Sequence, residues 1–105
     1  MEVYYYTSGE RQPVREYIDA LPTDERGVVL ATLLDIEERD LAGTAVTRHI
    51  EGKLWELKIT RHHIFYVLIV GPVMVLLHAY KKQGQKAPPR ELAVARKRME
   101  EILGE

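Results

Sequence analysis

The chain has 105 residues, the size of one domain, and 46% of them are hydrophobic, so we expect a single domain with a buried core over residues 1–105. It contains no cysteine, which excludes disulfide bonds and thiolate metal sites. The formal net charge of −1 is unevenly divided along the chain. Residues 1–47 hold four Lys/Arg against ten Asp/Glu, whereas residues 48–105 hold eleven Lys/Arg against six Asp/Glu. The basic second half is either an anion-binding surface or an ordinary solvated one.

The N-terminal segment predicts a strand followed by a helix. Residues 3–6 are β-branched and aromatic and end at Ser8-Gly9, which is typical of a strand and a turn. Pro13 suits the first position of a helix, where its missing N–H costs nothing. The buried stripe of this helix follows the helical spacing and consists of Val14, Tyr17, Ile18 and Leu21.

A second helix is predicted to follow the Leu21-Pro22 break. Thr23 is expected to cap its N-terminus, and Gly43 can close its C-terminus. Its apolar stripe consists of Val29, Leu33 and Ile36, widened by Leu30, Leu34 and Leu41. Residues 42–51 then predict a loop with room for a short extended piece.

From Lys53 onward the pattern predicts three strands and a final helix. Residues 53–60 alternate with a period of two, whereas residues 63–70 and 73–80 are nearly continuously apolar, which predicts central strands covered on both faces. A basic loop over residues 81–87 precedes the last helix, which begins after Pro88-Pro89. The order βααβββα predicts an α+β fold with a mostly antiparallel sheet, two N-terminal helices on one face and a C-terminal helix.

No apolar run is long enough to cross a bilayer, because residues 64–77 are interrupted by Gly71-Pro72. The N-terminus also lacks a basic segment followed by an apolar one, so we expect no signal peptide. These features predict a cytoplasmic protein with no membrane partner.

The register of the predicted hairpins brings several polar side chains together. A two-residue loop at Gly71-Pro72 would pair Phe65 with His78 and His63 with Tyr80. An even-numbered connection between the two preceding strands places Lys58 on the same face as His63. Lys58, His63, His78 and Tyr80 would then gather near one end of one face. The side chains expected on the opposite face, toward the first two helices, are Trp55, Leu57, Ile64, Tyr66 and Leu77.

This group of side chains has the chemistry that metal-free RNA cleavage requires. Attack by the 2′-hydroxyl needs a base for its proton, cations for the charged phosphorane and an acid for the leaving 5′-oxygen. Histidine suits either proton transfer, and Arg61, in the adjoining turn, would add positive charge. The histidines lack the spacing of a metal-binding motif, so we expect neither a metal nor another cofactor.

Each of these residues also has a structural interpretation. His78 lies in an apolar strand and suits a half-buried, hydrogen-bonded histidine that plays no part in catalysis. His62-His63 falls in a predicted turn and suits solvent exposure, and Lys81-Lys82 suits a solvated strand end. The sequence pattern by itself leaves both interpretations open.

Six segments of the chain, taken in order, resemble the HigB-like, phage-derived branch of the RelE superfamily. The most specific part is a strand ending in Leu-Leu-His followed by Lys-Lys and Gln-Lys-x-Pro, together with the Trp-Glu-Leu strand. The matching segments are Gln12–Ile18 with Leu21-Pro22, Leu54–Lys58, Arg61–Tyr66, Val75–Lys82, Gln85–Pro88 and Arg90–Ala95.

The resemblance implies a microbial-RNase-like toxin of a type II toxin–antitoxin system that cuts mRNA on the ribosome without a metal. It also implies a helix-turn-helix antitoxin from the same operon, with operator DNA contacted only through the complex. On this hypothesis Lys58 and Arg61 stabilise phosphate charge and His63 or His78 transfers protons. The residues expected to hold RNA are Tyr80, Lys81, Lys82 and Lys86.

Two positions depart from that family, which usually has arginine where this chain has Lys58 and His63. Arginine presents a bidentate fork to phosphate that neither replacement reproduces. Two alternatives therefore remain: a catalytically degenerate toxin fold that acts only as antitoxin partner and co-repressor, or a small nucleic-acid-binding module.

Overall fold

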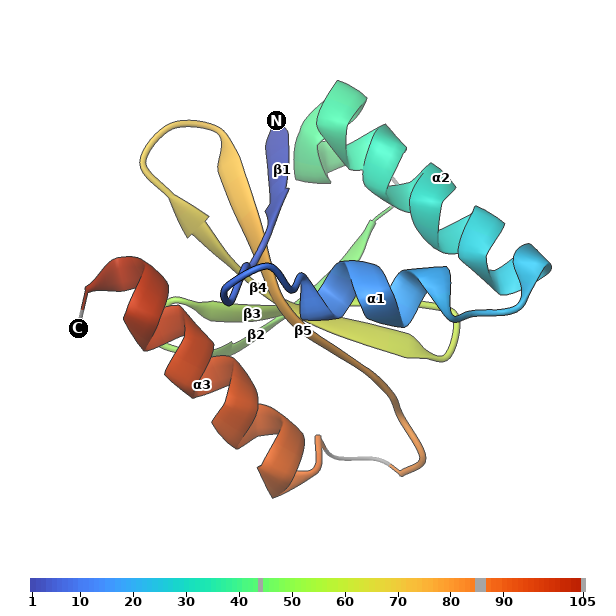
Figure 1. Ribbon diagram of the computed structural model, residues 1–105. Helices are drawn as coiled ribbons and strands as arrows, with labels where there is room; N and C mark the ends of the chain where they lie inside the picture. The colour runs from blue at the N-terminus through green and yellow to red at the C-terminus, as the bar shows by residue number, and fades with distance from the viewer. Residues whose placement is uncertain (44, 85–86, 105) are drawn as a thin grey trace.

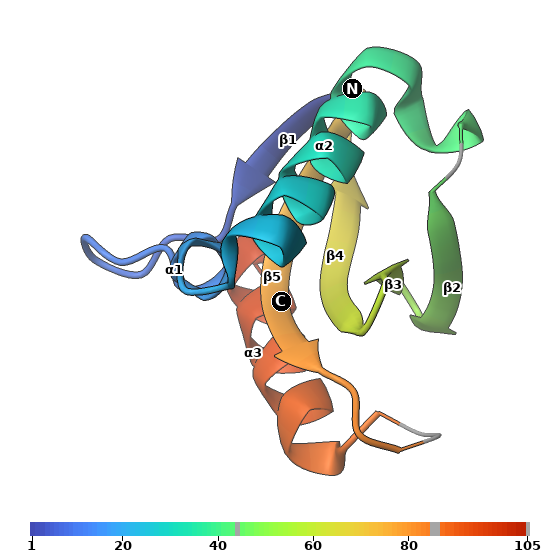
Figure 2. The ribbon, with the colours of Figure 1, turned by 90° about the vertical axis from the view of Figure 1, so that its right-hand side faces the viewer.

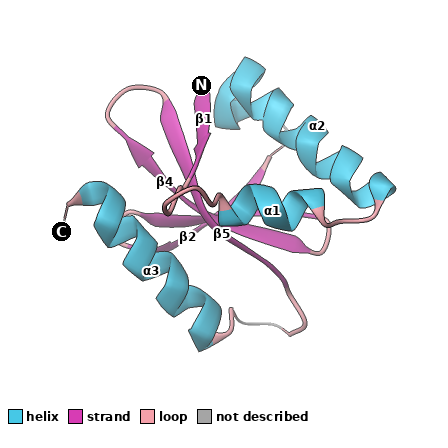
Figure 3. Cartoon of the chain, viewed as in Figure 1, coloured by secondary structure: helices cyan, strands magenta, loops and turns pink. Residues whose placement is uncertain are grey.

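The computed structural model describes residues 1–43, 45–84 and 87–104, which form the expected α+β fold (Figures 1 and 3). Five strands make one sheet in the order β1-β5-β4-β3-β2, with β1 parallel to β5 and the other pairs antiparallel. The elements are β1 (Glu2–Tyr5), α1 (Pro13–Asp19), α2 (Thr23–Arg39), a 3₁₀ helix η1 (Asp40–Ala42), β2 (Val46–Glu51), β3 (Leu54–Ile59), β4 (His62–Ile69), β5 (Val73–Lys81) and α3 (Pro89–Leu103).

Helices cover both faces of the sheet. Figure 1 shows α1 and α2 on one side and α3 on the other, and Figure 2 shows the sheet curving from β5 toward β2. Each face has its own apolar cluster, one built around Ile18, Leu33 and Ile64 and the other around Phe65 and Ala95. The nearly continuous apolarity of β4 and β5 is thereby explained, because these central strands are buried on both faces.

The ends of α2 differ from those expected. Thr23 is the first helical residue rather than the cap, and Pro22 occupies the cap position without a side-chain hydrogen bond. The helix ends at Arg39 because Asp40 adopts a positive φ of 58°. Gly43 follows η1 with a φ of −80°, so it does not supply the left-handed residue that was expected to close α2.

Residues 46–51 form a full strand, β2, at the edge of the sheet, where the sequence predicted a loop with room for only a short extended piece. The strand pairs with β3 and places Arg48 opposite Glu56. An edge strand is half exposed and is not required to be apolar, so β2 lacks the hydrophobic alternation that identified its neighbours.

The β4–β5 hairpin has the expected register at Phe65–His78, but its loop and its regularity differ from those predicted. Its loop has three residues rather than two, because Ile69 pairs with Val73. The register then shifts between Phe65 and Tyr66, and Leu77 is the extra residue on β5. This bulge offsets the longer loop, so Phe65 still pairs with His78.

The bulge also corrects the predicted position of one side chain. Leu77 packs in the cluster beneath α3, not toward α1 and α2, because the residue inserted at the bulge reverses the alternation. The other four residues assigned to that face contact the α1/α2 cluster as expected; they are Trp55, Leu57, Ile64 and Tyr66. Within the described ranges, no helix is both long and apolar enough to cross a membrane.

Candidate functional site

Lys58, His63 and Tyr80 form one row across three strands, as the register predicted. Lys58 pairs with His63 and His63 pairs with Tyr80. The row begins beside a two-residue β3–β4 turn, in which Thr60 takes a positive φ of 55°. Directly opposed residues share a face, so the three side chains lie on the side of the sheet that carries α3.

The centre of the site is a carboxylate that the sequence reasoning did not select. Glu56 is only 3% exposed and accepts a hydrogen bond from the Tyr80 hydroxyl at 2.9 Å and from the Arg48 guanidinium at 3.2 Å. His63 Nδ1 lies 3.0 Å from Glu56 Oε1, but its direction does not meet the geometry of a hydrogen bond. The imidazole and the carboxylate are therefore in close contact without an aligned hydrogen bond between them.

Tyr80 fixes the floor of the site. Its ring stacks on His63 at a centroid distance of 5.4 Å and on Phe65 at 5.5 Å. Burial raises the pKa of Tyr80 far above its usual value, and the hydrogen bond to Glu56 raises it further. The phenol consequently stays protonated at neutral pH and donates its hydrogen bond to Glu56.

A hollow of about 370 Å³ opens above this buried group. Arg48, Lys58 and Lys82 supply three cationic side chains to its lining, against the single carboxylate of Glu56. The remaining lining residues are Val46, Thr47, His63 and Gly84. The hollow combines a positive rim with an imidazole and a carboxylate at its base, an arrangement that suits a phosphodiester.

Neither histidine of the His62-His63 pair is a solvent-exposed turn residue. Both belong to β4, with side chains 2% and 5% exposed, because the turn lies one position earlier at Thr60-Arg61. His62 points to the opposite face, where Tyr17 hydroxyl lies 2.7 Å from its Nδ1 and Glu25 lies 2.8 Å from its Nε2. Alternation along the strand thus gives the two neighbours different surroundings.

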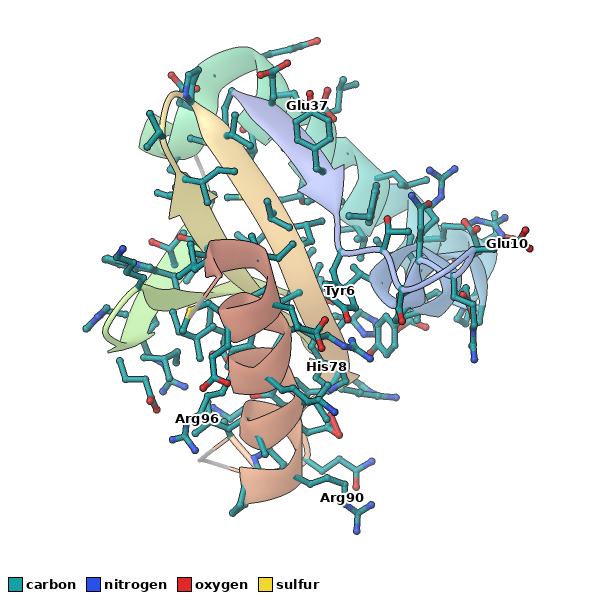
Figure 4. The ribbon with its side chains drawn as sticks, turned by 60° about the vertical axis from the view of Figure 1, so that its left-hand side comes forward. Tyr6, Glu10, Glu37, His78, Arg90 and Arg96 are labelled. Atoms are coloured by element: carbon teal, nitrogen blue, oxygen red, sulfur yellow. The ribbon has the colours of Figure 1, made fainter. Side chains whose placement is uncertain are left out.

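His78 lies apart from His63 although it is on the same face. Its Nε2 donates to Glu91 at 2.8 Å, and Arg98 donates to its Nδ1 at 3.3 Å. Figure 4 shows His78 against α3, with Arg90 extending from the start of that helix. Both ring nitrogens are occupied by α3, which matches the half-buried, hydrogen-bonded interpretation and leaves the hollow to His63.

The other candidates are divided between the two faces. Arg61 and Lys81 line a separate hollow on the α2 side with Asp24 and Glu25, whereas Lys82 turns to the site. Lys86, expected to hold RNA, lies outside the described residues. Within the described parts of the chain, no group of three metal-ligating side chains comes together.

A family model described as "Phage derived protein Gp49-like (DUF891)" matches residues 16–100. The chain belongs to the Gp49-like family. This is a toxin-like family of toxin–antitoxin systems, which suggests an antitoxin partner. Among curated proteins, none matches the chain. The family match runs from within α1 to within α3 and includes every described residue that lines the hollow.

Two residues of this site, Arg48 and Glu56, were missed from the sequence. The period of two places Glu56 on the same face as Lys58, but the sequence reasoning assigned it no role. The available signal was that Glu56 lies two positions before Lys58, on the face of the sheet predicted to carry His63. Arg48 had no signal of its own, because its strand was predicted as a loop.

Proposed function

We propose that this chain is the toxin of a type II toxin–antitoxin system and that it cleaves mRNA on the ribosome. The observation that carries the proposal is the Glu56–His63 pair at the base of a hollow rimmed by Arg48, Lys58 and Lys82. Family membership supports the toxin class, and the hollow supports the reaction. Metal-free transesterification needs a proton acceptor, a proton donor and fixed positive charge, which Glu56, His63 and the cationic rim would supply.

In the proposed reaction, the 2′-oxygen attacks phosphorus and the bond from phosphorus to the 5′-oxygen breaks. Glu56 accepts the proton of the 2′-hydroxyl, and protonated His63 gives its proton to the 5′-oxygen. The products are a 2′,3′-cyclic phosphate and a 5′-hydroxyl. Glu56 and His63 are assigned because a carboxylate and an imidazole suit proton transfer, whereas Tyr80, with its raised pKa, keeps its proton at neutral pH.

The positive rim would carry the charge of the phosphorane. Arg48 can present its planar guanidinium to phosphate, as the arginines usually found at positions 58 and 63 would do. It is half-exposed, at the mouth of the hollow, while one of its nitrogens donates to Glu56. A guanidinium supplied from β2 thus offsets the two replacements that distinguish this chain from the RelE-like pattern.

The proposed partners follow from the same function. The ribosome presents the mRNA, and a helix-turn-helix antitoxin encoded beside this chain neutralises it in the cytoplasm, with operator DNA contacted through the complex. Co-purification of the untagged neighbouring gene product with a tagged copy of this chain tests the partnership. A neighbour that never co-purifies at moderate salt argues against it.

The decisive experiment adds the purified chain to translating ribosomes and maps new mRNA ends by primer extension. We expect cleavage that ends in 2′,3′-cyclic phosphate, that needs ribosomes, and that His63→Ala abolishes. Lys53→Ala, which removes an exposed lysine outside the hollow, is the charge-matched control and should cleave normally.

Growth of induced cells separates the alternatives. Arrested growth with new mRNA ends supports the enzyme. Normal growth and intact mRNA, together with a neighbour that co-purifies, would instead identify the degenerate toxin fold acting only as partner and co-repressor.

A further inference from the structure

The C-terminal half of β5 has an open backbone edge. β1 pairs with β5 only from Val73 to Leu76, so the strand continues to Lys81 without β1 beside it. Lys82 N–H donates to Arg61 carbonyl, and Tyr80 pairs with His63. Because backbone groups alternate between the two sides of a strand, those of Ala79 and Lys81 point away from β4, toward this open edge.

A second hollow, of about 880 Å³, lies along this edge between α1 and the start of α3. Tyr17, Pro88 and Pro89 give it flat apolar walls, and Glu91 lies beside β5 within it. Its volume falls in the range of small-molecule sites, about 300–1,000 Å³. Flat apolar walls beside a backbone edge that β1 leaves unpaired suit a planar ring that carries hydrogen-bonding groups on its rim.

Glu91 is held in place and has accepting capacity left. Its Oε2 accepts the hydrogen bond from His78 Nε2 at 2.8 Å, while Arg98 fixes the other side of that imidazole. Its Oε1 makes no hydrogen bond to any residue of the described ranges, and the side chain is only partly buried. A carboxylate is an acceptor only, so the group it faces must present N–H or O–H donors.

This hollow adjoins the proposed catalytic one. Gly84 lines both, and Tyr80 lines the second while its hydroxyl contacts Glu56 in the first. A base held at the β5 edge would therefore belong to a nucleotide next to the scissile phosphate. His78, which the catalytic site does not use, has a role here in orienting Glu91.

We infer that the hollow between α1, β5 and α3 is a nucleobase subsite selective for guanine. The Watson–Crick edge of guanine presents two adjacent N–H donors, N1–H and N2–H, whereas adenine, cytosine and uracil each present one. The Glu91 carboxylate accepts that pair, the ring lies between Tyr17 and the prolines, and the edge of Ala79 and Lys81 meets the remaining polar groups. The inference rests on the proposed function, since it takes RNA as the ligand.

Mononucleotide binding tests the subsite without cleavage. The 3′-monophosphates of guanosine, adenosine, cytidine and uridine are titrated into the chain, and the backbone amide signals are followed by NMR. We expect shifts at Ala79, Lys81 and Glu91, with guanosine binding at least about tenfold more tightly than the others. Glu91→Gln should remove this preference, while Glu100→Gln, an exposed α3 carboxylate, should keep it.

Each outcome decides between the two proposals. Equal binding of all four bases, or absence of shifts at the β5 edge, overturns the subsite even if His63→Ala abolishes mRNA cleavage and the proposed function stands. Guanosine binding at the edge by a chain that cleaves no mRNA overturns the proposed function and retains the subsite. Where both hold, guanine should predominate beside the mapped cleavage points and Glu91→Gln should erase that bias.

Discussion

His63 Nδ1 lies 3.0 Å from Glu56 Oε1, and the two side chains are 5% and 3% exposed. The carboxylate and the imidazole are close enough to act together on one phosphodiester, as proposed above. Glu56→Gln keeps the shape and removes the charge. We expect cleavage by this variant to fall by about a hundredfold to ten-thousandfold, as measured by single-turnover cleavage on ribosomes.

The same pair gives a second, sharper test. If Glu56 and His63 act as one unit, the double variant Glu56→Gln/His63→Ala should be little slower than either single variant. Additive losses would mean that the two residues contribute separately. Thermal unfolding of each variant is the control, because both side chains are buried and a loss of folding would imitate a loss of activity.

Lys58 is the exposed cation of the row, so its contribution should depend on charge and reach. Lys58→Ala should slow cleavage by at least about tenfold, and up to about a hundredfold if the ammonium contacts the transition state. Lys58→Arg should retain or raise activity, since a guanidinium can bind phosphate through two nitrogens. Lys53→Ala is the matched control, and equal rates for it and Lys58→Ala would remove Lys58 from the site.

The α+β class, the central strands and the row Lys58–His63–Tyr80 could be predicted because period-two patterns and hairpin connections determine which side chains share a face. The expected pairing of Phe65 with His78 is confirmed, although the two-residue loop from which it was predicted is wrong. A three-residue loop and a bulge at Leu77 shift the register by one in opposite directions. Among the side chains that the sequence assigned to the α1/α2 face, Leu77 is the one that the bulge misplaces.

The missing part of the site came from the edge of the sheet. β2 is polar and half exposed, so its residues carry no hydrophobic alternation, and Arg48 could not be placed opposite Glu56. The importance of Glu56 depends on burial between Arg48 and Tyr80, which is a tertiary property. Alternation within β4 places His62 and His63 on opposite faces of the sheet. Which of the two faces the hollow depends on the pairing of β4 with β3, in which His63 lies opposite Lys58.

His62 should matter for stability and not for catalysis. The hydroxyl of Tyr17 donates to its Nδ1 at 2.7 Å and its Nε2 donates to Glu25 at 2.8 Å, so this buried imidazole joins β4 to α1 and α2. His62→Ala should lower the free energy of unfolding by about 2–4 kcal/mol, from the lost hydrogen bonds and the cavity. Denaturant titration measures that loss.

The comparison with His63→Ala is the control for this prediction. Below its melting temperature, folded His62→Ala should cleave mRNA at the parental rate, whereas His63→Ala should be inactive while folded. A folded His62→Ala protein without activity would place the α1/α2 face in the catalytic site and contradict the assignment made here.

Tyr17 should make the fold sensitive to alkaline pH. Burial, and then the nearby charges of Glu25 and Glu91, raise the pKa of Tyr17 from 10.0 to about 12. Because the folded state keeps this proton longer than the unfolded chain, the associated stability is complete below pH 10 and is lost as the pH rises through about 12.

Tyr17→Phe removes that titration together with the hydrogen bond to His62. The variant should be less stable at neutral pH by about 1 kcal/mol, but its stability should fall less steeply between pH 10 and about 12, by at most about 1.4 kcal/mol per pH unit. Urea unfolding at a series of pH values measures both effects. Tyr4→Phe is the control, because that residue is 52% exposed and its pKa is raised mainly by the hydrogen bond to Glu2, so its removal should change the slope less. If the free energy of unfolding falls with pH equally steeply in the wild type and in Tyr17→Phe, Tyr17 has the same pKa in the folded and unfolded states. The contact with His62 and the surrounding burial would then not raise that pKa.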